Sequence, residues 1–414
     1  MPNNPVKWLY PGMKVKRWLL TSLFGLIIVA IGAFLTAAEY KFISFFGFVW
    51  IICGIILIVL GMAKMIVSLL TLFLPKGERD LVNILYKKRY LERGPKIVAI
   101  GGGTGLSHLI AGLKEYTANI TAVVTVADSG GSSGRLREEF NIVAPGDIRN
   151  CLVALADAPE LVGELFQFRF SQDSELKGHN FGNLFLTAMY QLTDGDFERA
   201  VKETSKVLAI RGKVVPSTVC NVHLIAEYED GTRAEGEANI PNPDITIKKL
   251  SLSEKDVKPT DDALAAIEEA DIIILGPGSL YTSVIPNLLI EPLTDKISKS
   301  SAFKIYVCNV MTQHGETDSF TASGHLKAIL DHVNGQKVVD SVLVNDAPVS
   351  EDLLGRYQGE ESFPVKPDIE AIRELGCRVV STDLLSTTDF VRHDSNKLNK
   401  ALIKLIESNR IIKR

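Results

Sequence analysis

The sequence has few cysteines, no excess of basic charge, no internal repeat and no low-complexity segment. It has five cysteines in 414 residues, and none forms the short paired spacing of a zinc site or a disulfide framework. The formal net charge of −4 argues against a nucleic-acid-binding protein, which needs an extended basic footprint. We therefore expect no nucleic-acid partner, and we expect the thiols to be buried in a reducing compartment. The cysteines are Cys53, Cys151, Cys220, Cys308 and Cys377.

Charge is also missing from two long stretches near the N-terminus. Residues 18–38 and residues 42–63 contain no charged side chain, and only three residues separate them. Each stretch is long enough to cross a hydrocarbon core about 30 Å thick. The first is longer than the ~7–15-residue apolar region of a signal peptide, and a second follows at once, so a cleaved leader is the weaker interpretation.

Basic residues flank this pair of stretches on both sides, which favours a hairpin with both ends in the cytosol. We predict a two-helix transmembrane hairpin over residues 1–74, in contact with lipid through residues 18–74. A charged juxtamembrane linker is expected over 75–95, followed by the main domain, 96–414. The predicted location is the plasma membrane, with two spans, and with both termini and the main domain on the cytoplasmic side.

From residue 96 onward, strand-like apolar runs alternate with helical patterns. The strands are expected at 97–100, 120–126, 271–275 and 303–308. Such alternation predicts an α/β fold with a Rossmann-like, mostly parallel sheet. The stretch 207–240 differs, because it has an Asp-Gly turn between two apolar runs. It predicts an antiparallel β-hairpin insertion.

A glycine-rich turn follows the first of these strands. It reads G-G-G-T-G over residues 101–105 and opens a helical pattern. Bare backbone N–H groups at the positive end of a helix can approach a phosphate closely. The turn lacks the last glycine of G-x-G-x-x-G and the lysine of a P-loop, so neither common nucleotide motif is present. We expect a phosphate or sugar-nucleotide site that includes Gly102, Gly103, Thr104 and Gly105.

A second loop follows the strand 120–126 and begins with Asp128. It contains three glycines and three serines between residues 129 and 134, which offer many donors to phosphate oxygens. Asp128 suits a ribose hydroxyl or a Mg²⁺ ion that arrives with the phosphates, although aspartate also caps ordinary turns. The candidate ligand-binding residues here are Asp128, Ser129, Gly130, Gly131 and Ser132.

Two more loops carry polar groups suited to a nucleotide sugar. The segment 178–183 presents two amides and an imidazole, which fit a uracil edge or sugar hydroxyls. A Gly-Pro-Gly-Ser turn at 276–279 follows another apolar strand and opens another helix. Its tyrosine could stack on a base or pack within the protein. The candidates are Asn180, Asn183, Gly278, Ser279 and Tyr281.

Six segments, in order, together resemble the gluconeogenesis factor (YvcK) family, which is related to the 2-phospho-L-lactate transferases. The resemblance covers roughly residues 96–400. It implies a Rossmann-like sheet that binds a UDP-sugar, such as UDP-N-acetylglucosamine or UDP-glucose. The segments are 101–105, 128–137, 145–150, 179–183, 276–283 and 309–317.

The resemblance also implies a regulatory role in carbon metabolism, cell-wall precursor supply and cell shape, exerted through an unidentified protein partner. The alternative is a Mg²⁺-dependent transferase of a nucleotide-linked group, in which Asp128 holds the metal. The transferase relatives carry paired aspartates after their second strand, whereas this chain has Asp128-Ser129. That difference favours binding over catalysis. A homo-oligomer is left open.

Overall fold

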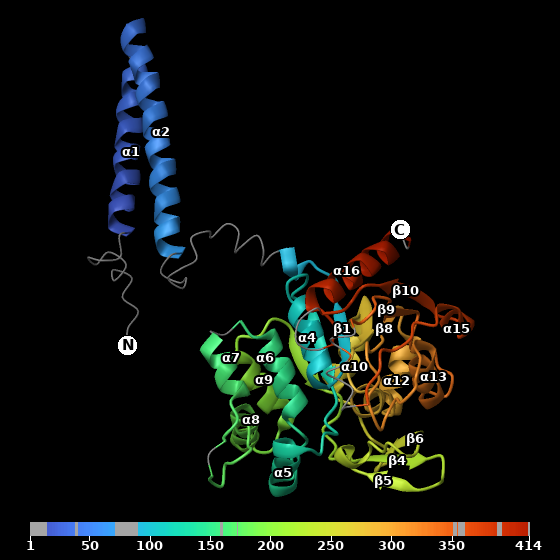
Figure 1. The fold of residues 1–414 in the computed structure, drawn as a ribbon. Helices are drawn as coiled ribbons and strands as arrows, with labels where there is room; N and C mark the ends of the chain where they lie inside the picture. The colour runs from blue at the N-terminus through green and yellow to red at the C-terminus, as the bar shows by residue number, and fades with distance from the viewer. Residues whose placement is uncertain are drawn as a thin grey trace. The chain divides into compact units, whose positions relative to one another are not determined.

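In a computed structural model, the chain forms two compact units, residues 1–85 and residues 86–414 (Figure 1). The predicted boundaries at residues 74 and 95 stay predictions, and most of the predicted linker lies outside the described residues. The structure describes residues 15–37, 40–70, 90–157, 160–171, 173–350, 354, 361–386 and 391–412.

The first unit is a helical hairpin of α1 (Val15–Thr36) and α2 (Lys41–Leu70). Glycines spaced seven residues apart face the partner helix, because seven residues bring a side chain back to nearly the same face. A Cβ on Gly25 would lie 2.8 Å from the carbonyl oxygen of Gly54, and a Cβ on Gly32 would lie 2.8 Å from that of Gly47. The two backbones therefore touch along a glycine seam, which we define as Gly25, Gly32, Gly47, Gly54 and Gly61.

The outer faces of this hairpin are apolar and exposed. Phe34, for example, is 81% exposed, and Phe45 is 67% exposed. By length and composition, segments 16–36 and 41–68 are each sufficient to cross a membrane. This outcome agrees with the predicted hairpin and leaves the membrane itself, and the orientation in it, as predictions.

The second unit is built on a seven-stranded parallel sheet with the order β10-β9-β8-β7-β1-β2-β3. The predicted α/β class and the mostly parallel sheet are confirmed. Buried β-branched and leucine residues dominate the inner strands, as expected for a sheet covered on both faces. The strands are β1 (Ile97–Gly101), β2 (Ile120–Val124), β3 (Lys213–Pro216), β7 (Ile272–Leu275), β8 (Phe303–Val307), β9 (Ser341–Asn345) and β10 (Arg378–Thr382).

Alternate residues of β1 point to opposite faces of the sheet. Ile97 and Ala99 belong to one core, and Val98 and Ile100 belong to the other. The first core is covered by α4 (Gly103–Leu113), α6 (Gly146–Leu155), α7 (Glu160–Gln167), α8 (Phe181–Leu192), α9 (Phe197–Val207) and α16 (Ser395–Ile412). The second is covered by α10 (Asp261–Glu269), η3 (Leu280–Val284), α11 (Ile285–Leu288), α12 (Glu291–Lys299), α13 (Ala322–His332) and α15 (Ile369–Glu374).

A separate antiparallel sheet, with the order β5-β4-β6, lies at the opposite end of this unit from α16 (Figure 1). Its strands are β4 (Leu224–Tyr228), β5 (Arg233–Glu235) and β6 (Ile247–Leu252). The predicted hairpin is confirmed as β4 and β5, which pair antiparallel across the Asp-Gly turn, where Gly231 has φ +83°.

Two details of the predicted insertion need correction. Residues 214 and 215 belong to β3, which pairs parallel with β2 at the edge of the main sheet. Pro216 ends that strand, and proline is tolerated at a sheet edge because no ladder donor is needed there. The second hairpin strand ends at Glu235 rather than residue 240, and the short 3₁₀ helix η2 (Glu237–Asn239) follows.

Candidate functional site

The strand order places a topological switch point between β1 and β7. From β1 the chain builds outward through β2 and β3, and it then returns to add β7 on the other side. In open α/β sheets, ligands bind outside the carboxyl ends of the strands at this point. The two predicted glycine turns meet there, since a Cβ on Gly105 would collide with the carbonyl oxygen of Pro277. We call this region the carboxyl edge.

Three helices begin at the carboxyl edge without a side-chain cap. The N-cap residues of α4, α5 (Gly131–Phe140) and α6 are Gly102, Gly130 and Pro145, and none of their side chains caps the helix. An N-terminus carries free backbone donors and a positive partial charge. The starts of α5 and α6 are adjacent, because a Cβ on Gly146 would lie 3.0 Å from Oδ2 of Asp128 and would also collide with Ser133 Oγ.

Carboxylates serve these N–H groups instead. The Asp147 carboxylate accepts the backbone N–H of Gly103, and Asp128 Oδ1 accepts that of Gly130 at 2.8 Å. Burial raises the pKa of Asp147 to about 6, and the nearby negative Asp128 adds to the increase while Arg149 opposes it. The helix starts are therefore prepared for negative charge, which the protein's own carboxylates supply in this structure.

Two glutamates extend this set of acids. Glu316 is almost fully buried and accepts hydrogen bonds from Ser279 Oγ and from the Gln313 amide. Burial raises its pKa to about 7, against these hydrogen bonds, and the charge of Glu237 contributes to the increase. Glu237 accepts the Ser129 N–H, and burial raises its pKa too.

Sequence reasoning missed most of this acid set. Asp147 and Glu316 have the pattern of ordinary helix-start residues, and Glu237 has no distinguishing pattern. The Pro-Gly pair just before Asp147 is the sequence feature that could have identified this helix start as part of the site. Gly146 has no side chain, so Ser133 and Asp128 can approach the start of α6.

The serine and amide candidates form one buried network. The Ser132 hydroxyl accepts the Asn180 N–H at 3.1 Å, and Asn180 Oδ1 accepts the Asn183 N–H at 3.2 Å as the N-cap of α8. Asn183 Nδ2 donates to Ser133 Oγ at 3.4 Å, whereas its Oδ1 is buried without a partner. The structure thus brings the loop after β2 together with the start of α8.

The loop after β7 is held by Asn309, at the carboxyl end of β8. Its amide accepts the Gly278 N–H at 3.2 Å and donates to the Gly278 carbonyl at 2.7 Å. Ser279 lies beside Glu316, and Thr104 is exposed at the start of α4. Tyr281 instead packs in the core, with its ring centre 6.4 Å from that of Phe320. Of the fourteen candidates, Tyr281 is thus placed as a core aromatic, and the others lie on the carboxyl-edge loops and helix starts.

Asp128 is the predicted metal ligand under the transferase interpretation. Among the described residues, no three acidic, histidine or cysteine side chains form a group that could hold a metal ion. Magnesium usually needs only one or two protein carboxylates when phosphates supply the rest. Asp128 therefore fits a Mg²⁺ ion beside a bound nucleotide, whose phosphates would supply most of the ligands.

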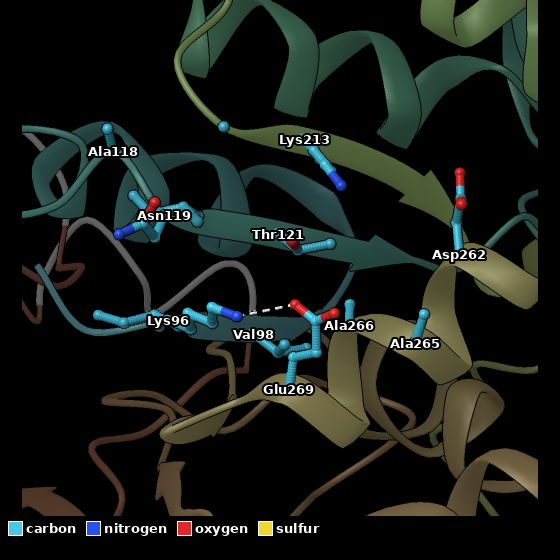
Figure 2. Close-up of a pocket in the computed structure, with 13 residues that line it drawn as sticks. Lys96, Val98, Ala118, Asn119, Thr121, Lys213, Asp262, Ala265, Ala266 and Glu269 are labelled. Carbon is cyan, nitrogen blue, oxygen red and sulfur yellow. Dashed lines mark hydrogen bonds and ion pairs between the residues drawn. The ribbon is translucent and has the colours of Figure 1, made fainter. Parts of the chain in front are cut away.

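A hollow of about 390 Å³ lies where β1, β2 and β3 begin (Figure 2). Figure 2 shows Lys96 paired with Glu269 of α10, while Lys213 extends from β3 across the same hollow. The two paired side chains are more than half exposed, so their ion pair is worth little. This hollow contains none of the glycine turns, and we place the candidate site at the carboxyl edge.

Some matches to known proteins are confined to the second unit, whereas others extend into the first. Residues 97–385 match the family described as "2-phospho-L-lactate transferase CofD". A gluconeogenesis factor of Bacillus subtilis is 47% identical over 76% of this chain and 98% of its own length. A Nostoc protein named "Putative gluconeogenesis factor" is 48% identical over 97% of this chain and 92% of its own length, so that match includes most of the hairpin.

A solved structure agrees with these sequence matches. The crystal structure of a Bacillus halodurans protein, described as a member of the UPF0052 family, superposes with a TM-score of 0.72 at 47% identity. It covers 75% of this chain and 99% of the Bacillus halodurans chain. Some relatives therefore consist of the second unit alone, whereas others share the hairpin.

Proposed function

The chain belongs to the CofD family, among relatives named gluconeogenesis factor, and from that premise we propose that it is a membrane-anchored regulatory protein that binds a UDP-sugar. In this proposal the second unit binds UDP-N-acetylglucosamine or UDP-glucose at the carboxyl edge. It acts on carbon metabolism, cell-wall precursor supply and cell shape through a protein partner.

The proposal rests on one observation: helix starts without a side-chain cap lie together at the switch point. The first residue of α4 and the loop before α5 offer N–H groups of Gly103, Gly130 and Ser129, and each of these now donates to a carboxylate. A diphosphate makes the same kind of hydrogen bond and carries more negative charge. We propose that the diphosphate replaces these carboxylates and that Asn180 and Asn183 bind the sugar or the uracil.

The hairpin supplies the anchor in this proposal. Its two helices are long and apolar enough to span a bilayer, and their exposed faces carry large apolar side chains suited to lipid. Basic residues on both sides favour a cytoplasmic location for the second unit. Anchoring would hold that unit near the inner leaflet.

The second candidate is a Mg²⁺-dependent transferase of a nucleotide-linked group, which the family match favours. Asp128 would then share the ion with the phosphates of the nucleotide, which would supply charge neutralisation. Binding without turnover is preferred here because Ser129, a neutral residue, follows Asp128 where the transferase relatives carry a second aspartate.

Calorimetric titration separates the two candidates. The second unit, residues 86–414, is suitable because it is compact and because relatives consist of this unit alone. The ligands are UDP-N-acetylglucosamine, UDP-glucose, GDP and NAD, each with and without Mg²⁺. Saturable binding of a UDP-sugar without Mg²⁺, lost in Asn180→Ala, supports the regulatory protein. Binding of GDP alone, and only with Mg²⁺, contradicts it and supports the transferase.

A further inference from the structure

Three arginines surround the segment that leads into α8. Arg135 comes from α5, Arg149 from α6, and Arg169 from the short segment that bridges to Asn180. Neutral groups hold them in place. Arg135 donates to the Lys177 carbonyl at 3.0 Å, and Arg169 donates to the Gly178 carbonyl at 2.7 Å. We call Arg135, Arg149 and Arg169 the arginine cluster.

Arg149 is the buried member of this cluster. It is 8% exposed, and its stem packs on the first turn of α8, where a Cβ on Gly182 would lie 2.7 Å from its Cδ. One terminal nitrogen donates to Asn150 Oδ1 at 2.7 Å, but the buried Nε has no partner. A buried donor without a partner is costly, and a bound anion can supply the missing acceptor.

The charge of the cluster is only partly compensated. Within the described parts of the chain, none of the three guanidinium groups forms an ion pair with a carboxylate. Burial lowers the pKa of Arg149 to about 10, and the positive charge of Arg169 lowers it further, whereas Asp147 and Asp128 oppose the decrease. The positive end of α8 adds to the same potential. An anion would relieve both the repulsion and the unpaired donor.

The cluster adjoins the carboxyl edge. Ser132, in the first turn of α5, accepts the N–H of Asn180, the N-cap of α8. One hydrogen bond therefore connects the loop proposed to bind the diphosphate to the segment that the arginines surround. A ligand that spans this short distance would place its sugar end at the cluster.

We propose that the arginine cluster and the start of α8 form an oxyanion subsite, which binds a carboxylate or phosphate carried on the sugar side of the nucleotide ligand. The claim that the anion is part of a nucleotide ligand rests on the proposed function. The claim that the subsite binds an anion does not. Guanidinium groups bind both oxyanions through paired N–H donors, so the two share one chemistry. An acidic group on the sugar side would therefore add affinity to that of the nucleotide sugar itself.

The test compares two ligands that differ at one carbon. The full chain in lipid nanodiscs is titrated with UDP-glucuronate and with UDP-glucose, which carry a carboxylate and a hydroxymethyl group at the same position. We expect UDP-glucuronate to bind about tenfold more tightly, the value of one good charged hydrogen bond. Arg149→Gln and the exposed Arg169→Gln should each remove this preference, because each should weaken the binding of UDP-glucuronate more than that of UDP-glucose. Equal affinity in the unmodified chain, or a preference that survives both substitutions, overturns the proposal.

Inorganic phosphate provides an arm that does not depend on nucleotide binding. Phosphate should raise the melting temperature of the unmodified chain and of Arg199→Gln, a control on the exposed face of α9. It should raise that of Arg149→Gln by clearly less. If neither nucleotide sugar binds but this pattern holds, the proposed function fails and the subsite stands. No phosphate effect in the unmodified chain contradicts the subsite.

Discussion

In the helical hairpin, glycines at every seventh position face the opposite helix, whereas glycines at the carboxyl edge face carboxylate, carbonyl and hydroxyl oxygens. A Cβ on Gly47 would lie 2.6 Å from the backbone nitrogen of Thr36. A Cβ on Gly102 would collide with the Asp147 carboxylate, and one on Gly146 with the Ser133 hydroxyl. The same residue type thus allows close helix packing in one unit and close polar approach in the other.

The two sets of glycines therefore contribute to different properties of the protein. A side chain in the glycine seam would push two intact helices apart, since the backbone hydrogen bonds of a membrane-spanning helix lie within that helix. A side chain at the carboxyl edge would displace the groups that organise the ligand site.

Gly105→Ala should give the largest loss of stability. Its methyl group would collide with the backbone carbonyl of Pro277, which cannot move without shifting the turn after β7. The free energy of unfolding of residues 86–414, measured in urea, should fall by about 3 kcal/mol, at the upper end of overpacking costs.

Gly163→Ala is the matched control for this substitution. Gly163 lies inside α7, and a Cβ added there would meet no heavy atom within 4 Å beyond its own helix backbone and chain neighbours. Alanine is the better helix former, so the free energy of unfolding should rise by about 0.5–1 kcal/mol. Equal destabilisation by the two substitutions would contradict the close contact between Gly105 and the Pro277 carbonyl.

Glu316→Gln should change how stability depends on pH. The pKa of Glu316 is about 7 in the folded unit and 4.5 as the ordinary value, so the folded state binds more protons between these values. Stability should therefore fall as pH rises from about 4.5 to about 7. Well above pH 7 the substitution should raise the free energy of unfolding by about 3 kcal/mol, the shift expressed as energy.

This prediction is measured by urea unfolding from pH 4.5 to pH 8. The control is Glu370→Gln, since the Glu370 side chain is 79% exposed. Its pH profile should follow that of the unmodified unit. A Glu316→Gln profile that also follows the unmodified one would show that the Glu316 carboxylate is not destabilising in the folded state.

Gly54→Ala should separate the helices of the hairpin. Its methyl group would lie 2.7 Å from the Gly25 carbonyl and 2.8 Å from the Val29 nitrogen. The cost should be about 1–2 kcal/mol, because helices in lipid associate mainly by close packing. Energy transfer between dyes on Leu20→Cys and Val59→Cys, in a Cys53→Ser background, should decrease. Ala33→Leu on an exposed face should leave it unchanged.

Much of the fold could be predicted from the sequence because buried parallel strands form uninterrupted apolar runs. The expected strands at 97–100, 120–126, 271–275 and 303–308 correspond to β1, β2, β7 and β8. The strands at 341–345 and 378–382 were missed. β10 is only partly buried, and its mixed sequence R-V-V-S-T lacks a continuous apolar run.

The glycine turns could be predicted for a similar reason, since they follow strands directly in the sequence. The acids could not, because their proximity depends on the tertiary fold. Glu237 follows β5 of the small sheet, yet it accepts the N–H of Ser129 from the loop after β2. The arginine cluster is equally distributed, with one member from each of three segments.

Hydrogen–deuterium exchange of residues 86–414, with and without UDP-N-acetylglucosamine, shows which end of the strands binds the ligand. We predict slower exchange in the segments 101–105, 128–134 and 276–281, which form the carboxyl edge. We predict no change around Lys96, Asn119 and Lys213, which line the hollow at the opposite end of the strands (Figure 2). Slower exchange confined to that hollow, with the carboxyl edge unaffected, would contradict this prediction.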